Sequence, residues 1–203
     1  MFVQNTWRGR DRLGPVVLPL GVIHPIHGLA LALAITVLLF ADTGASAETT
    51  LEDLGPAPAF TLESHDGDRF DLAGYLEKGP VIIDFWATWC KPCRRAMPHL
   101  QALYEKYRQR GVTVIGISED DPRSQAKIGS FLRSQQITFP VLLDGEKQVA
   151  RQYRVATLPT TFLISSDGQI VSLHRGYRDG DEKLLEQQLE ALLAVSGQEV
   201  SEP

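Results

Sequence analysis

Cysteine is scarce in this 203-residue chain, which contains only Cys90 and Cys93. The absence of a third cysteine excludes a lipoprotein anchor attached through cysteine. A structural zinc site is also disfavoured, because such sites take four Cys or His ligands and the only histidine near the pair is His99. The chemistry of the pair therefore has to be inferred from its spacing.

Basic residues are not in excess either, since 20 Lys and Arg stand against 25 Asp and Glu for a net charge of -5 at pH 7. A mildly acidic chain suggests solubility and gives no reason to expect a nucleic-acid partner. No internal repeat is visible. The length, with 43% hydrophobic and 22% charged residues, favours one ordinary globular domain, which we expect to be monomeric.

Charged residues are absent from 13–41, directly after three arginines in the first dozen residues. This pattern predicts an export signal over 1–47, and Ala45 and Ala47 form an A-x-A site for cleavage before Glu48. The alternative is an uncut anchor, because 13–41 is long enough to span a membrane. In either case the globular part is expected outside the cytoplasm, in the periplasm or another extracytoplasmic space, soluble after cleavage or anchored.

The two cysteines lie in "WATWCKPCRRAMP", residues 86–98, with two residues between them. In an exported protein a structural bridge is the ordinary interpretation of a cysteine pair. The stabilisation by a disulfide grows with the loop it closes, however, and a two-residue loop constrains the unfolded chain very little. The spacing therefore favours reversible redox chemistry.

The rest of the sequence alternates apolar β-branched runs with segments whose apolar residues recur three or four positions apart. We expect a linker over 48–55, one domain over 56–196 and a flexible tail over 197–203. The expected elements, in order, are a strand pair around the turn Asp66-Gly67, a buried strand 80–87, a helix carrying the stripe 96–107, a strand 112–118, a helix from about 122 to 135, a short strand 139–144, a short helix 146–153, strands 160–165 and 170–177, and a helix 181–195 capped by Asp179 or Asp181. Strands that alternate with helices and end in a hairpin predict an α/β fold with a mixed sheet.

Two motifs carry a resemblance to a known family. The segment "DFWATWCKPCRRAMP" followed by "TLPTTFLI" resembles the thioredoxin superfamily, in which a C-x-x-C lies beside a βαβ pattern. The chain also resembles the TlpA/ResA-like branch of this superfamily over roughly residues 56–195. The features that carry this resemblance are the opening segment "PAPAFTL", the extra strand and helix between 112 and 135, and the export signal. The resemblance implies a thioredoxin-like fold and an exported thiol-disulfide oxidoreductase, often a reductase in cytochrome c maturation or copper-site assembly.

The strand-to-helix junction gives the cysteines distinct expected roles. A helix N-terminus carries partial positive charge and free N–H groups, and Lys91 adds a further charge, so the pKa of Cys90 should fall below the free-thiol value. Cys90 is therefore the predicted nucleophile, and Cys93 is the predicted resolving thiol that closes the Cys90–Cys93 bridge. Pro92 stiffens the turn between them. No cofactor beyond this pair is expected, and no metal.

Asp84 lies inside the apolar run "VIIDFW", where a buried, unpaired charge would be costly. Burial should raise its pKa and make it a proton acceptor for Cys93. The position also matches the buried aspartate of thioredoxins. The alternative is a hydrogen-bonded polar residue with a structural role.

Ala96 departs from the branch that the chain resembles, since many of its members carry an acidic residue three positions after the second cysteine. Asp84 would then act alone. Loss of a negative charge should stabilise the thiolate further and make the couple more oxidising, which counts somewhat against a pure reductase.

Four residues are expected to contact substrate. Pro159 occupies the position of the superfamily's cis-proline, and the backbone of Leu158 before it is free to pair with an extended peptide. Trp89 and Pro92 would add an apolar contact surface beside the cysteines, whereas Trp86 is expected in the core.

Three functions remain open from the sequence. The favoured one is an exported reductase of protein disulfides, such as those of apocytochrome c or copper-site proteins, kept reduced by a membrane thiol donor. The second is a net disulfide oxidase or isomerase. The third is a metallochaperone that binds Cu(I) through the two thiolates and a histidine, because soft thiolates select that ion.

Overall fold

The computed structural model describes Leu51 and residues 53–199. The chain divides into two units, Met1–Ser46 and Ala47–Pro203, and all described residues belong to the second. The predicted signal over 1–47 therefore lies outside the described residues. Among the helices of the described part, none is both long and apolar enough to cross a membrane.

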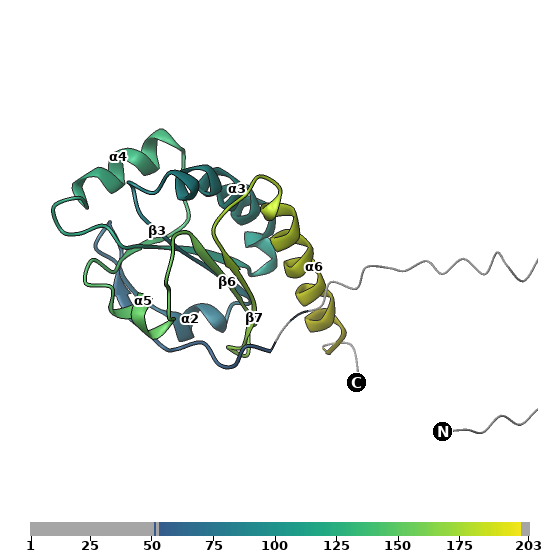
Figure 1. Cartoon of the computed structure of the whole chain (residues 1–203). Helices are drawn as coiled ribbons and strands as arrows, with labels where there is room; N and C mark the ends of the chain where they lie inside the picture. The colour runs from purple at the N-terminus through teal and green to yellow at the C-terminus, as the bar shows by residue number, and fades with distance from the viewer. Residues whose placement is uncertain (1–50, 52, 200–203) are drawn as a thin grey trace, which may run out of the picture. The chain divides into compact units, whose positions relative to one another are not determined.

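A five-stranded mixed sheet forms the centre of the domain (Figure 1). Its strand order is β5-β4-β3-β6-β7; β3, β4 and β5 run parallel, whereas β6 is antiparallel to both β3 and β7. The strands are β3 (Val81–Trp86), β4 (Thr113–Ser118), β5 (Val141–Leu143), β6 (Thr160–Ile164) and β7 (Ile170–Arg175). This arrangement confirms the predicted α/β fold and the thioredoxin-like architecture.

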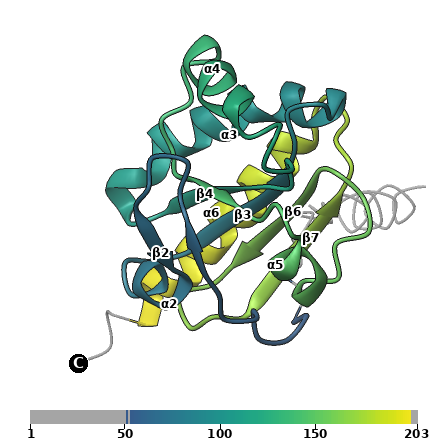
Figure 2. The same cartoon turned by 90° about the vertical axis from the view of Figure 1, so that its left-hand side faces the viewer.

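Helices cover both faces of this sheet, as Figures 1 and 2 show. One face carries α3 (Lys91–Tyr107), α4 (Ala126–Ser134) and α6 (Asp181–Glu199), and the other carries α2 (Leu72–Leu76) and α5 (Gln148–Gln152). A short 3-10 helix, η1 (Arg108–Arg110), follows α3.

The side chains of β3 alternate between these two layers, as the pleat of a strand requires. Ile82 and Trp86 pack into the core beneath α3, α4 and α6, whereas Ile83 packs toward α2 and α5. Asp84 therefore belongs to the α3 side, and Trp86 lies in the core as predicted, with no exposed surface.

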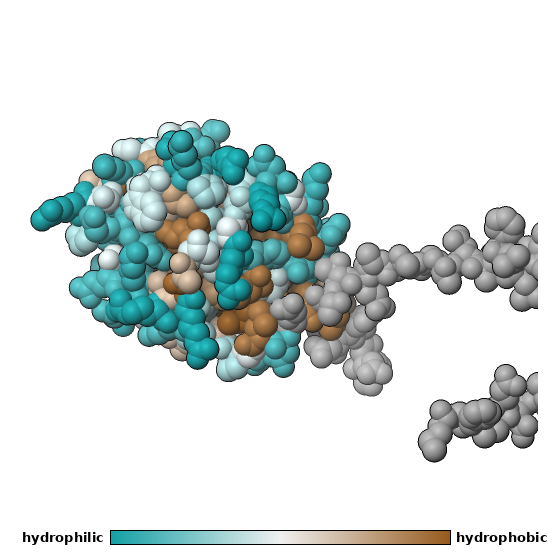
Figure 3. Space-filling model, in the orientation of Figure 1, coloured by the Kyte–Doolittle hydropathy of each residue, from teal (hydrophilic) through white to brown (hydrophobic). Residues whose placement is uncertain are grey.

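A separate antiparallel pair, β1 (Thr61–Glu63) and β2 (Arg69–Asp71), confirms the expected N-terminal strands. It attaches to the edge of the main sheet, because the backbone N–H of His65 donates to the carbonyl of Val141 at 2.9 Å. On the face in Figure 3, hydrophilic residues prevail and hydrophobic ones form separate patches.

Three helices differ from the prediction: one was not predicted, and two have other bounds. The residues after β2 form the short helix α2, because the carboxylate of Asp71 accepts a hydrogen bond from the N–H of Ala73 and caps a first turn. Helix α4 begins at Ala126 and not near Pro122, since Asp121 accepts the N–H groups of Arg123 and Ser124 and holds this segment in turns. Helix α6 runs four residues past the predicted end, to Glu199, and Asp181 is its first residue.

Candidate active site

The two cysteines lie where β3 ends and α3 begins. Cys90 is the N-cap of α3, and its Sγ accepts a hydrogen bond from the N–H of Cys93 at 3.2 Å. A disulfide joins the two residues, whose Cα atoms are 5.3 Å apart. Pro92 is tolerated in this first turn because its missing N–H would have had no partner within the helix.

The environment of the pair is positive and asymmetric. The first turn of α3 contains no acidic residue, so the free N–H groups at the helix end act on the sulfur of Cys90 without opposition from that turn. Cys90 retains 5% of its surface exposed, whereas Cys93 is completely buried. An incoming sulfur can therefore reach Cys90 first, and Cys93 faces the interior.

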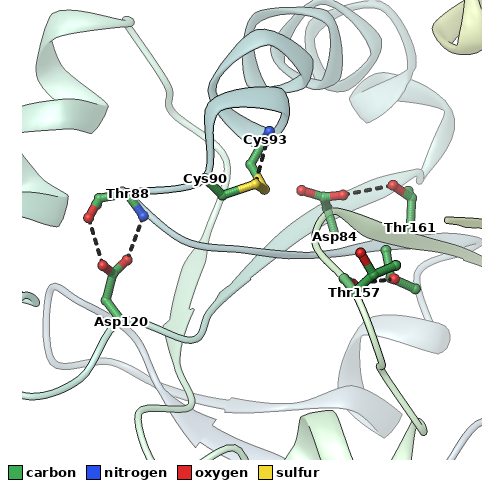
Figure 4. The surroundings of a disulfide bond; sticks show 8 residues. Asp84, Thr88, Cys90, Cys93, Asp120, Thr157 and Thr161 are labelled. Carbon is green, nitrogen blue, oxygen red and sulfur yellow. Dashed lines mark hydrogen bonds between the residues drawn. A yellow bond between two sulfur atoms is a disulfide. The ribbon is translucent and has the colours of Figure 1, made fainter. Parts of the chain in front are cut away.

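Asp84 lies beside the disulfide and has no exposed surface (Figure 4). The hydroxyl of Thr161 donates to its Oδ1 at 2.7 Å, and its Oδ2 has no hydrogen-bond partner among the described residues. Figure 4 shows the unpaired oxygen directed toward the disulfide. Burial raises the pKa of Asp84 to about 7, against a smaller opposing effect of the Thr161 hydrogen bond. The structure thus places a carboxyl group that titrates near neutral pH beside the two sulfurs.

Thr161 was missed by the sequence analysis. It faces Asp84 directly in the antiparallel pairing of β3 with β6, which explains how two residues 77 positions apart meet. The motif "TLPTTFLI" places two threonines after the proline, but only the register of the two strands identifies which one faces the carboxyl.

A second group was also missed: a clamp that holds the loop before Cys90. Asp120, fully buried, accepts two hydrogen bonds from Thr88, one from its N–H at 2.8 Å and one from its Oγ1 at 2.6 Å (Figure 4). Ser118 Oγ donates a third at 2.9 Å. The available signal was that β3 and β4 are neighbouring parallel strands, so residues that follow them meet at the same sheet edge.

An open groove of about 550 Å³ begins at Cys90. Three of the four predicted substrate residues line it: Trp89, Pro92 and Leu158. Trp89 has 65% of its surface exposed, as expected for a contact residue. Pro159 is joined to Leu158 by a cis peptide bond, as predicted, but is buried behind the groove and does not line it.

The backbone of Leu158 is the part of the groove suited to a peptide. Among the described residues, its N–H and carbonyl make no hydrogen bond, although the next carbonyl, that of Pro159, accepts the N–H of Gly176 at 2.8 Å. An extended peptide could pair there in the manner of an added strand.

Ala96 is buried on α3 and lines a small cavity of about 30 Å³ together with Thr161 and His174. Its methyl group supplies no charge to the pair, so Asp84 is the buried carboxyl group that lies next to the disulfide in Figure 4.

Comparison with known proteins identifies the family. The family model described as AhpC/TSA matches residues 55–173, which is more than half of the chain. The chain belongs to the AhpC/TSA family. Among its curated relatives, the thiol-disulfide oxidoreductase ResA of Bacillus cereus is 34% identical over 131 residues, which are 64% of this chain and 74% of the relative. ResA of Bacillus subtilis is 37% identical over 120 residues, which are 59% of this chain and 65% of the relative, just under two thirds of its length.

A solved structure supports the same assignment. A protein of Chlorobium tepidum described as the thiol:disulfide interchange protein DsbE is 33% identical, with a TM-score of 0.64 over 71% of this chain and 99% of that one. The resemblance to the ResA-like branch of this thioredoxin-like family is thus confirmed, and the chain is an oxidoreductase of the thiol-disulfide class. The individual roles of Asp84, Trp89, Pro92, Leu158 and Pro159 stay predictions.

Proposed function

We propose that this protein is an exported reductase that transfers two electrons from Cys90 and Cys93 to disulfides of other exported proteins. The observation that carries the proposal is the placement of the pair: Cys90 at the groove and at the N-terminus of α3, and Cys93 buried near a carboxyl group whose pKa is about 7. The ResA relatives support the thiol-disulfide chemistry, and the sequence signal over 1–47 supports export.

In the first step the thiolate of Cys90 attacks one sulfur of the substrate disulfide. A mixed disulfide forms, and the substrate's other sulfur leaves as a thiolate that takes up a proton. The N–H of Cys93, which contacts Cys90 Sγ at 3.2 Å, and the helix N-terminus stabilise the attacking thiolate.

In the second step Cys93 attacks the sulfur of Cys90, which re-forms the Cys90–Cys93 disulfide and releases the second substrate thiolate. Cys93 must lose its proton first, and it is fully buried, so a group within the protein has to accept that proton. Asp84 is suited to this role because its unpaired Oδ2 faces the sulfurs and its pKa of about 7 lets it bind a proton at neutral pH.

The substrate binds as an extended segment along the groove. Trp89 offers an exposed ring beside the reacting sulfur, and the free backbone groups of Leu158 hold the segment by main-chain hydrogen bonds. Apocytochrome c and copper-site proteins are examples of clients with accessible cysteine pairs. Each turnover leaves the pair oxidised, so a membrane dithiol must return two electrons to it.

The reduction potential of the Cys90–Cys93 couple tests this proposal. The full chain is equilibrated with a dithiothreitol or glutathione series, and the oxidised fraction is measured by thiol alkylation. A value near about -270 mV is expected of a reductase. A value of about -120 mV would contradict the reductase and favour a net disulfide oxidase. The first turn of α3, which is basic and contains no acidic residue, gives this second candidate specific support.

A further inference from the structure

Positive charge is concentrated around the disulfide although the chain as a whole carries a net charge of -5. The groove at Cys90 is lined by three basic residues, Lys91, Lys147 and Arg151, and by one acidic residue, Glu119. Such a local excess in an acidic protein indicates a surface that attracts anionic groups.

The single carboxylate of the groove is already neutralised. Lys147 Nζ lies 2.9 Å from Glu119 Oε2, and only 6% of the Glu119 side chain is exposed. In the part of the chain that the structure describes, Lys91 and Arg151 have no carboxylate partner; Arg151 Nη1 donates instead to the backbone carbonyl of Glu146. The groove therefore presents two cationic side chains whose charge is not paired with a carboxylate of the described residues.

The positive surface continues on the other side of Lys91. A second hollow, of about 270 Å³, is lined by Lys91, Arg94 and Arg95 with Phe131 and Gln135, and it contains no acidic residue. Arg95 approaches Asp179 at 3.8 Å, with both side chains largely exposed, so this pair is weak. Lys91 lines both hollows and lies next to Cys90 in the sequence.

We propose that the groove selects substrates whose cysteine is flanked by an acidic, extended segment, with Lys91 and Arg151 pairing with the segment's carboxylates. This inference rests on the proposed function, because the segment is delivered to the same sulfur. An extended peptide advances about 3.3 Å per residue and points alternate side chains the same way. Carboxylates on one face of such a segment can therefore pair with Lys91 near the cysteines and with Arg151 on α5.

Three matched peptides test the inference. Each contains the same intramolecular disulfide, flanked by a run of aspartates, asparagines or lysines. The reduced full chain is mixed with each peptide at low salt, and the second-order rate constant is obtained from alkylation-quenched samples. The asparagine peptide reports the intrinsic reactivity of the thiols, so the ratio of the acidic to the neutral rate isolates the effect of charge.

Two double variants locate that charge. Lys91→Gln with Arg151→Gln removes both free cations of the groove. Arg69→Gln with Lys78→Gln is the matched control, because both residues are exposed and line neither hollow. The rates are also measured for Arg151→Gln alone, because Arg151 lies on α5, remote in sequence from the cysteines.

We expect the acidic peptide to react at least about tenfold faster than the lysine peptide at low salt, with the asparagine peptide between them. The preference should fall to within about threefold in the groove variant, remain in the control variant and fade at high salt. Equal rates for the three peptides, or a preference that survives in the groove variant, would overturn this inference while leaving the reductase intact. No reaction with any peptide would overturn the proposed function and this inference with it.

Discussion

The buried carboxyl of Asp84 should make the stability of the protein depend on pH. Its pKa is about 7 in the folded protein, against an ordinary value of 3.8. Because the pKa of Asp84 is higher in the folded protein, the folded state holds a proton at pH values between 3.8 and about 7, where the unfolded state has released it. The contribution of Asp84 to the free energy of unfolding should therefore be highest below about pH 4 and decrease as the pH rises through 7. The difference of roughly three pKa units corresponds to about 4 kcal/mol.

Asp84→Asn isolates this contribution. The substitution leaves every other titrating group in place, so the difference in unfolding free energy between the two proteins cancels their effects. An amide nitrogen beside the sulfurs without a partner costs about 1–3 kcal/mol at every pH, which shifts the difference without changing its slope. Relative to the parent, the variant should gain about 4 kcal/mol between pH 4 and pH 8.

The assay is urea unfolding of the oxidised full chain, followed by circular dichroism at several pH values across this window. Asp84→Leu, which has no polar atom, should show the same change with pH as Asp84→Asn. A difference that stays constant from pH 4 to 8 in both variants would refute the argument, because it would mean that the carboxyl titrates alike in the folded and unfolded chains.

Further predictions concern the partners of this carboxyl group and the reaction. Thr161→Val removes the hydrogen bond that favours the carboxylate, so the pKa of Asp84 should rise further and the pH dependence of stability should extend above pH 7; an unchanged profile would exclude the bond as a cause. Asp120→Ala leaves the N–H and hydroxyl of Thr88 without their acceptor and should lower the free energy of unfolding by about 1–3 kcal/mol, as measured by urea unfolding at one pH; an unchanged value would refute the clamp. Cys93→Ser should accumulate a mixed disulfide with substrate, visible by mass spectrometry under non-reducing conditions, whereas failure to trap any exported protein would count against the reductase.

The elements that could be predicted are those whose signal is local. The run "PVIIDFWA" and the apolar stripe from Ala96 to Tyr107 each carry one clear period, and both are found where expected, as β3 and α3. The short helix α2 was missed because its five residues span little more than one turn, too short to show a helical period. The start of α4 was misplaced because Pro122 also suits a turn that Asp121 stabilises.

The residues of the candidate site also divide into those with a local sequence signal and those without one. Three site residues could be found because each is unusual in its own segment. Cys90 and Cys93 form a pair in a chain with no other cysteine, and Asp84 is a carboxylate in an apolar strand. Thr161 and the Asp120 clamp depend on pairings between segments distant in the sequence. Such residues are ordinary in composition, and only the order and pairing of the strands show their partners.

The burial of Asp84 links the stability cost to the chemistry. A carboxylate with a pKa far below neutrality is a weak base and accepts a proton from a thiol poorly. A carboxyl group with a pKa near 7 is a stronger base and is still partly ionised at neutral pH, so it can both take up and release a proton. The fold achieves this by placing Asp84 under α3 with Thr161 as its only hydrogen-bond donor among the described residues and with one oxygen left unpaired toward the sulfurs. A second donor at that oxygen would stabilise the carboxylate, lower its pKa and weaken it as a base. With alanine at position 96, no acidic side chain from α3 shares this task. In the proposed mechanism the unpaired oxygen, costly for folding, is thus the feature that lets one carboxyl group accept the proton of the buried thiol.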